Sequence, residues 1–136
     1  MSQENVEIVR AIYADWERGD FSRDDWADPD IEFAWVDGPD PGRWIGLRGM
    51  SEGMRGMLTA WEEYRVVGEA FRELDAERVL VVLSAHGRGK SSGLELGQAG
   101  WIQRGVNVFR LRSGRVTGID AYYDRDRAFS DLGLEE

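Results

Sequence analysis

The sequence predicts an α+β domain in which helices near the start of the chain are followed by a run of antiparallel strands. Two observations support this prediction. Apolar residues recur with helical spacing near the start, and from residue 65 onward they follow the pattern of strands. Helices first and consecutive strands afterwards are typical of the α+β class. Because 136 residues suffice for one core, a single domain over residues 1–136 is expected.

The first expected element is an amphipathic helix near the start of the chain. Its buried face is predicted from residues at three- and four-residue spacing, namely Val6, Val9, Ile12, Tyr13 and Trp16. Ser2 or Asn5 can cap this helix, and the turn at Gly19 and Asp20 ends it. In the acidic stretch that follows, Pro29 stops any short helix that forms there.

A strand and a second helix come next. Ile31, Phe33 and Trp35 stand at alternate positions and predict a half-buried strand, and the Gly- and Pro-rich segment after it is expected to be a loop. Helical spacing then returns over a larger apolar set, namely Met50, Met54, Met57, Leu58, Trp61 and Tyr64. Because Gly53 and Gly56 weaken a helix, their presence indicates that another element packs closely against this one.

The rest of the chain is predicted to form strands, with one short helix at the end. The strands are expected over four segments, namely 66–74, 78–87, 94–111 and 115–124. A glycine- and serine-rich connection joins the second strand to the third, and Ser113 with Gly114 forms a hairpin turn. A terminal helix over 126–132 is expected to end at Gly133.

Composition argues against several classes of function. A net charge of −9 argues against nucleic acid as a partner, because phosphate binding depends on clustered lysine and arginine. The absence of cysteine excludes disulfides and zinc–thiolate sites, and with one histidine we expect no metal and no cofactor. No apolar run is long enough to span a membrane, and Met1–Asn5 does not resemble a signal peptide, so we expect a cytoplasmic protein.

Aromatic residues are the unusual feature of the composition. Six tryptophans, four tyrosines and five phenylalanines provide much flat apolar surface for a small chain. The residues expected to line one apolar pocket are Ile12, Trp16, Phe33, Trp35, Met54, Trp61, Val82, Trp101, Phe109 and Tyr123. The alternative is that the same side chains fill a dry core.

Seven local strings follow one another along the chain, namely Asn5–Arg10, Asp28–Phe33, Trp44–Gly49, Glu63–Val66, Gly87–Gly89, Phe109–Val116 and Ala121–Arg125. Together they resemble the SnoaL-like branch of the nuclear transport factor 2-like superfamily, which also holds ketosteroid isomerase. The resemblance implies a cone-shaped fold, in which a strongly curved antiparallel sheet wraps around the first helices and forms one deep apolar pocket for a small hydrophobic molecule. It also implies a homodimer through the convex face of the sheet. It does not specify a reaction, because the family includes several kinds of enzyme and non-catalytic members.

Ketosteroid isomerase uses a general-base carboxylate and an oxyanion hole made of a tyrosine and a neutral aspartic acid. By the resemblance, the base position falls on Phe33, and the tyrosine position falls on Ile12, with Tyr13 next to it. The aspartic acid position falls near Asn107, whose amide can still donate a hydrogen bond to an oxyanion. Because the base is missing, steroid isomerisation in that form is not expected.

Three other residues are candidates to move a proton. Asp37 continues the alternation of the preceding strand toward the pocket mouth, although an aspartate there also suits a turn. Asp120 matches the late-strand acid–base aspartate that the resemblance implies for cyclases, but alternation favours an outward position, paired with Arg104 or Arg110. His86, the one histidine, ends an apolar strand and suits either a general acid or base or a solvated position.

Two functional hypotheses follow from these residues. In the first, the chain is a cofactor-independent acid–base isomerase, cyclase or hydrolase for a polyketide- or steroid-like substrate, with Asn107 and Tyr13 polarising a carbonyl. In the second, it is a lapsed enzyme or binding protein that holds a hydrophobic molecule without converting it. The enzyme hypothesis gains strongly if a buried carboxylate or a buried His86 lies within hydrogen-bond reach of Asn107 or a tyrosine.

Overall fold

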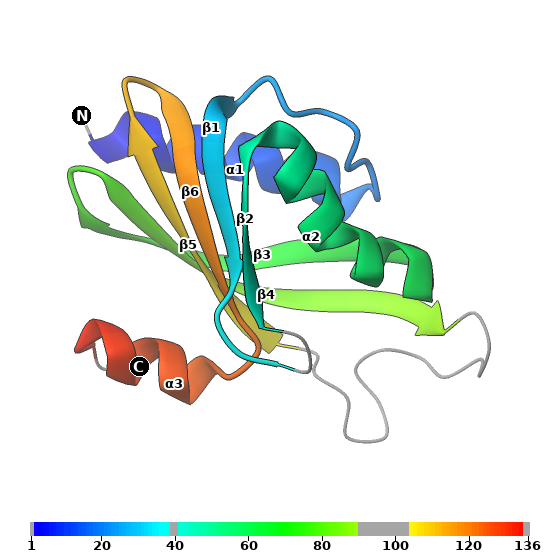
Figure 1. Cartoon of the computed structure of the whole chain (residues 1–136). Helices are drawn as coiled ribbons and strands as arrows, with labels where there is room; N and C mark the ends of the chain where they lie inside the picture. Colours follow the sequence, from blue (N-terminus) through cyan, green and yellow to red (C-terminus); the bar gives the residue numbers. More distant parts are fainter. Residues whose placement is uncertain (1, 39–40, 90–103, 135–136) are drawn as a thin grey trace.

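The computed structural model describes residues 2–38, 41–89 and 104–134. Within these residues the elements are α1 (Ser2–Glu17), β1 (Ala27–Trp35), β2 (Gly42–Ile45), α2 (Gly46–Ala60), β3 (Trp61–Asp75), β4 (Arg78–Gly89), β5 (Arg104–Arg112), β6 (Arg115–Tyr122) and α3 (Arg125–Leu132). Figure 1 shows α1 and α2 on one face of a strongly curved sheet and α3 on the other. The predicted α+β class, with a sheet curved around N-terminal helices, is confirmed.

The sheet is mixed, which corrects the expectation of a purely antiparallel one. Its described strands follow the order β2-β1-β6-β5-β4-β3. Strand β1 runs parallel to β6, while the other neighbours are antiparallel. A parallel pair needs a long connection, and here most of the chain separates the two strands. The edge strand β2 was not predicted, because four residues give too little alternation to reveal a strand.

Strand β3 is bent by irregular pairing with β4. The register shifts by one residue at three places, between Glu62 and Arg65, between Gly68 and Ala70, and between Glu73 and Asp75. At the first shift Glu63 adopts a left-handed φ of 53°. Bulges of this kind bend a strand and increase its twist. The prediction of a helix as far as Tyr64 is wrong, because α2 stops at Ala60 and Trp61 already begins β3.

Helix α2 lies close to the sheet because a glycine leaves room for aromatic rings. A Cβ atom at Gly53 would lie 2.8 Å from Cε3 of Trp44 and 2.9 Å from Cδ2 of Phe33. Trp35 fixes the same turn, since its indole N–H donates to the carbonyl of Gly53 over 2.8 Å. The close packing predicted from the glycines of this helix is therefore confirmed at Gly53.

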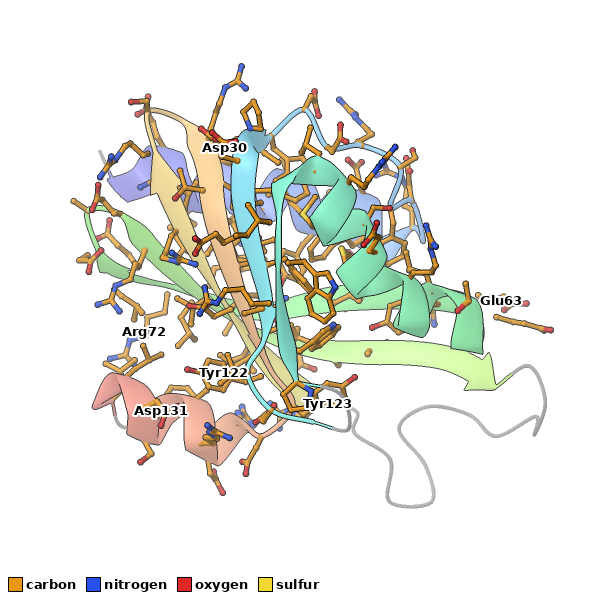
Figure 2. All side chains as sticks on the ribbon, viewed as in Figure 1. Asp30, Glu63, Arg72, Tyr122, Tyr123 and Asp131 are labelled. Carbon is orange, nitrogen blue, oxygen red and sulfur yellow. The ribbon has the colours of Figure 1, made fainter. Side chains whose placement is uncertain are left out.

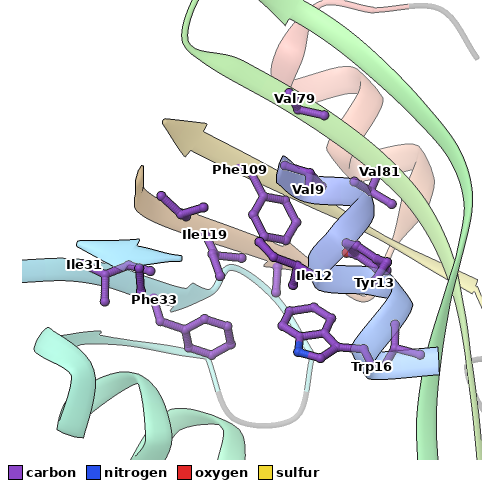
Figure 3. Packing of buried hydrophobic residues seen from close by; sticks show 14 of the residues in the cluster. Val9, Ile12, Tyr13, Trp16, Ile31, Phe33, Val79, Val81, Phe109 and Ile119 are labelled. Carbon is purple, nitrogen blue, oxygen red and sulfur yellow. The ribbon is translucent and has the colours of Figure 1, made fainter. Parts of the chain in front are cut away.

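Buried side chains form two clusters, one on each face of the sheet. The inner face, which carries α1 and α2, holds the larger cluster, seen in Figure 3; it includes Val9, Ile12, Ile31, Phe33, Val79, Val81, Phe109 and Ile119. The outer face, which carries α3, holds the smaller cluster of Leu80, Val82, Val106, Val108, Tyr122, Ala128 and Phe129. Successive residues of β4 and β5 therefore enter different clusters.

Hydrogen bonds and backbone geometry test three further predictions about helices. The terminal helix is confirmed: the Asp124 carboxylate accepts from the N–H of Arg127, and Gly133 ends α3 with a φ of 68°. Asn5 does not cap α1, because its amide donates instead to the carbonyl of Ala76 over 2.9 Å. No short helix precedes Pro29 in this described stretch, since Pro29 lies inside β1 where its pairing with β6 is irregular.

Candidate functional site

The inner face of the sheet borders an apolar pocket. The space between its side chains is partly open to solvent. The described lining residues are Trp16, Phe21, Phe33, Trp35, Met54, Leu58, Tyr64, Val66, Leu83, Ala85, Gly105, Asn107, Ala121, Tyr122 and Tyr123. Asn107 therefore brings an amide to walls that are mainly aromatic and aliphatic.

Two groups of aromatic rings form much of the wall. The ring of Phe21 stacks on Trp16 with centroids 5.8 Å apart and on Tyr64 with centroids 5.7 Å apart. In the second group, the centroid of the Trp35 ring lies 5.1 Å from that of Tyr123 and 5.4 Å from that of Phe33. Such rings bury large, flat apolar surfaces and so suit a planar apolar ligand.

Tyr64 belongs to the pocket because of the bulge at Glu63. The extra residue between Glu62 and Arg65 changes which side chains of β3 point inward, so Tyr64 and Val66 both line the pocket. Sequence reasoning assigned Tyr64 to a helix and missed it as a site residue. Its only sequence signal is an aromatic residue directly before a strand, which does not distinguish a helix end from a bulge.

The polar centre of the site is a hydrogen-bonded pair. Nδ2 of Asn107 donates to the hydroxyl oxygen of Tyr13 over 2.9 Å. Tyr13 is only 2% exposed and lies behind Asn107 in the core. Burial raises the pKa of Tyr13 above its usual value of 10.0, although the hydrogen bond from Asn107 opposes the shift. Tyr13 is therefore a neutral phenol that orients the amide of Asn107.

Tyr64 and Tyr123 add further phenol groups to the pocket. Burial raises the pKa of Tyr64, and the nearby phenol of Tyr123 raises it further. The Asn107 amide has a second N–H and a carbonyl oxygen in addition to the N–H that Tyr13 accepts. The arrangement can therefore form hydrogen bonds with a hydroxyl or carbonyl group in an otherwise apolar environment.

Asp37 has a structural role at the pocket rim. Its carboxylate accepts the backbone N–H of Tyr123 over 2.5 Å and that of Asp124 over 3.1 Å. These partners lie 86 and 87 residues away in the sequence, so the carboxylate joins two distant segments of the chain. Asp37 is not among the lining residues described above, and its role as a base there stays a prediction.

Asp120 and His86 lie on the outer face. Oδ1 of Asp120 is 3.6 Å from Nη2 of Arg110, which is the outward pairing that alternation favoured. Nε2 of His86 is 3.2 Å from Oγ of Ser84, on the face of β4 opposite to Leu83 and Ala85, which line the pocket. Neither residue is among the described lining residues, so the hypothesis that one of them moves a proton inside the pocket stays a prediction.

The predicted pocket-lining residues divide into three groups. Those that line the pocket are Trp16, Phe33, Trp35, Met54 and Tyr123. Ile12 and Phe109 are buried in the inner cluster, and Val82 packs in the outer one, so its prediction is wrong. The side chain of Trp61 and the whole of Trp101 fall outside the described residues. Of the two predicted carbonyl-binding residues, Asn107 reaches the pocket and Tyr13 supports it from behind.

The described residues carry neither a metal-binding cluster nor a membrane-spanning helix. Across residues 2–38, 41–89 and 104–134, no group of three or more histidine, aspartate or glutamate side chains is placed to hold a metal ion. In the same residues, no helix combines the length and apolar character needed to cross a membrane.

A curved sheet that carries two helices over an apolar pocket defines the nuclear transport factor 2-like class of α+β proteins. Within that class the chain belongs to the SnoaL-like domain family, whose sequence profile matches residues 9–119. No curated protein matches the sequence.

Solved structures share this fold at low sequence identity. A nuclear transport factor 2-like protein of unknown function from Burkholderia pseudomallei is 22% identical, with a TM-score of 0.70 over 96% of this chain and 97% of its own. A candidate SnoaL-like polyketide cyclase from Jannaschia is 16% identical, with a TM-score of 0.70 over 88% and 85%. TerC, co-crystallised with polyporic acid, is 23% identical, with a TM-score of 0.67 over 95% and 97%.

Proposed function

We propose that this chain binds a flat, hydrophobic small molecule, polyketide- or steroid-like in shape, that carries a hydroxyl or carbonyl group for Asn107. The supporting observation is the Asn107–Tyr13 pair at an aromatic pocket. Burial of apolar area drives binding, by about 25 cal/mol for each Å². A ligand that covers the half-buried amide of Asn107 without a partner for its remaining polar atoms loses free energy, so the pocket favours ligands with a matching polar group.

Binding without conversion is the form of this proposal that the lining residues favour. Among the lining residues that the structure describes there is neither a carboxylate nor a histidine, and general acid–base catalysis most often uses these groups. Each predicted proton-moving side chain has another partner, a backbone amide for Asp37, Ser84 for His86 and Arg110 for Asp120. TerC, with its polyporic acid, offers a precedent for a small molecule bound to a protein of this fold.

Thermal unfolding against a library of polyketides, steroids and terpenoids tests the proposal. A ligand at 100 times its Kd should stabilise the fold by about 2.7 kcal/mol. Asn107→Leu should reduce this ligand-induced stabilisation more for compounds with a hydroxyl or carbonyl group than for their deoxygenated analogues. Ser84→Ala, which changes a polar residue on the outer face, is the matched control. The proposal is wrong if no compound stabilises the protein. It is also wrong if the Asn107→Leu variant binds the oxygenated compounds and their deoxygenated analogues as tightly as the unaltered chain does.

An acid–base enzyme is the second candidate function. The observation in its favour is the fixed amide of Asn107, which is suited to stabilise charge on a carbonyl oxygen. Each stabilising compound is incubated with the protein and analysed by mass spectrometry and chiral chromatography. Conversion that Asn107→Leu abolishes would favour the enzyme, and recovery of unchanged compound would favour binding alone.

The proposal includes a homodimer through the outer face of the sheet and a cytoplasmic location. Sedimentation equilibrium tests the first, since a mass equal to one chain at micromolar concentration would contradict it. Cell fractionation of the natural host tests the second.

A further inference from the structure

A contact between the ends of β1 and β6 has no part in the binding chemistry described above. We propose that Asp37 is a positioning residue of the pocket: its carboxylate holds the backbone of Tyr123, which fixes the Tyr123 ring against Trp35. Asp37 thereby sets the affinity for the ligand without touching it. This inference rests on the proposed function, because it concerns a wall of the same pocket.

The carboxylate of Asp37 extends the pairing of β1 with β6 beyond the last backbone contact. The backbone N–H of Val36 donates to the carbonyl of Ala121 over 2.9 Å. One residue further on, the two oxygens of Asp37 accept the N–H groups of Tyr123 and Asp124, at 2.5 and 3.1 Å. Hydrogen bonds to an ionised acceptor are stronger than those between neutral groups. The backbone of Tyr123 is therefore held more firmly than by ordinary pairing.

Gly38 brings the loop backbone against the same ring. Its φ is 93°, and a Cβ atom there would lie 2.4 Å from Cδ1 of Tyr123. The ring of Trp35 also contacts Tyr123, with centroids 5.1 Å apart. Asp37 holds the backbone while Gly38 and Trp35 pack against the ring, so the carboxylate and the ring belong to one assembly.

The position of Tyr123 matters for the ligand because its ring is part of the pocket wall. Its phenol also lies near enough to Tyr64 to raise the pKa of that residue. Figure 2 shows Tyr122 beside α3, where its hydroxyl lies 3.4 Å from a carboxylate oxygen of Asp131, and Tyr123 farther from that helix. A displacement of Tyr123 would therefore change the shape of the binding site.

The experiment uses the full chain labelled with 3-fluorotyrosine, with 2-naphthol as a planar probe that carries one hydroxyl group. Asp37→Ala is compared with the matched control Asp28→Ala, which also removes a carboxylate that accepts a backbone N–H, that of Asp30 at 2.8 Å. The control lies near the opposite end of β1 from the pocket rim. Tyr123→Phe assigns the fluorine resonance of Tyr123.

We expect Asp37→Ala to shift or broaden the Tyr123 resonance and to weaken 2-naphthol binding about tenfold. Asp28→Ala should change neither. In a Tyr123→Ala background, Asp37→Ala should weaken binding by less than about twofold, because its effect passes through the missing ring. A purely structural role would instead give the same loss in both backgrounds.

An unchanged Tyr123 resonance, or an equal loss of binding with and without the Tyr123 ring, would overturn the inference. If 2-naphthol fails to bind the unaltered chain, the proposed function fails for this class of planar hydroxyl compounds. The fluorine resonance still decides whether Asp37 positions Tyr123. Should Asp37→Ala not fold, Asp37→Asn keeps one acceptor oxygen and should give a smaller shift of the same resonance.

Discussion

The inner and outer faces of this sheet are built from the same strands, but only the outer face combines an apolar cluster with ion pairs, while the described pocket on the inner face has no charged lining residue. On the inner face, β5 contributes Asn107 and Phe109 to an aromatic, uncharged environment. On the outer face, the next residue of β5, Arg110, lies 3.6 Å from Asp120 and 3.7 Å from Glu32. Because successive side chains of a strand point to opposite faces, neighbouring positions have unrelated roles. A charged residue near a pocket residue in sequence is therefore no indication of charge in the pocket.

The largest expected effect concerns stability on the inner face. Phe109 is fully buried. The centroid of its ring lies 5.8 Å from that of Tyr13 and 6.3 Å from that of Trp16. Phe109→Ala should lower the free energy of unfolding by about 3–5 kcal/mol, measured by urea denaturation. Val82→Ala, at a buried position of the outer face, should cost about 1.5 kcal/mol. An equal loss in the free energy of unfolding for the two variants would mean that the two faces contribute equally to stability.

Substitutions on the inner and the outer face should also differ in their effect on ligand binding. Asn107→Leu should weaken 2-naphthol binding about 10-fold, because the ligand hydroxyl loses the partner that the half-buried amide provides, an effect of about 1–2 kcal/mol. Asp120→Asn and His86→Ala alter the outer face and should leave Kd within twofold in isothermal titration calorimetry. If Asp120→Asn weakens binding as much as Asn107→Leu does, the assignment of the site to the inner face is wrong.

Tyr13, on the inner face, should make the stability of the fold depend on pH under alkaline conditions. Burial holds the pKa of Tyr13 above 10.0 in the folded chain, so the folded state retains a proton that the unfolded state loses. This contribution to stability is complete below about pH 10 and declines as the pH rises further, by about 1.4 kcal/mol per pH unit. Tyr13→Phe should reduce that slope in urea titrations between about pH 8 and 11. Identical slopes for both chains would show that Tyr13 does not titrate as inferred.

The smallest effect is expected from the ion pairs of the outer face. Arg43 lies 3.0 Å from Glu32, and the two side chains are 57% and 39% exposed. Arg43→Ala should cost about 0.2–1 kcal/mol, measured by thermal unfolding, and the difference should vanish in about 1 M salt. A loss larger than that of Val82→Ala would mean that the charged residues act as one network.

Alternation and helical spacing predicted most of the fold and part of the site. They indicated the inner positions of Trp16, Phe33 and Trp35 and favoured the outward position of Asp120. They failed along β4, where Val82 was assigned to the pocket. Because α3 covers the outer face there, residues 79–83 are apolar at every position, and a continuous apolar run does not reveal which side chains face a cavity.

Other parts of the site depend on geometry that one sequence does not contain. The bulge that turns Tyr64 inward is centred on Glu63, which has no glycine or proline to mark it. The partners of Asp37 lie in a strand 86 residues away, so its role could not be read from its neighbours in the sequence. Both features arise from tertiary packing, which local spacing does not record.

The lack of space at Gly53 determines where the pocket can be resized. Any side chain at this position would meet the rings of Trp44 and Phe33 within 3 Å, so this part of the wall cannot be rebuilt without loosening α2. The next residue of the helix, Met54, and Leu58 one turn later both line the cavity. Methionine adapts readily to differently shaped neighbours. Variation or protein engineering that adapts this scaffold to a larger or smaller ligand is therefore best directed at positions 54 and 58.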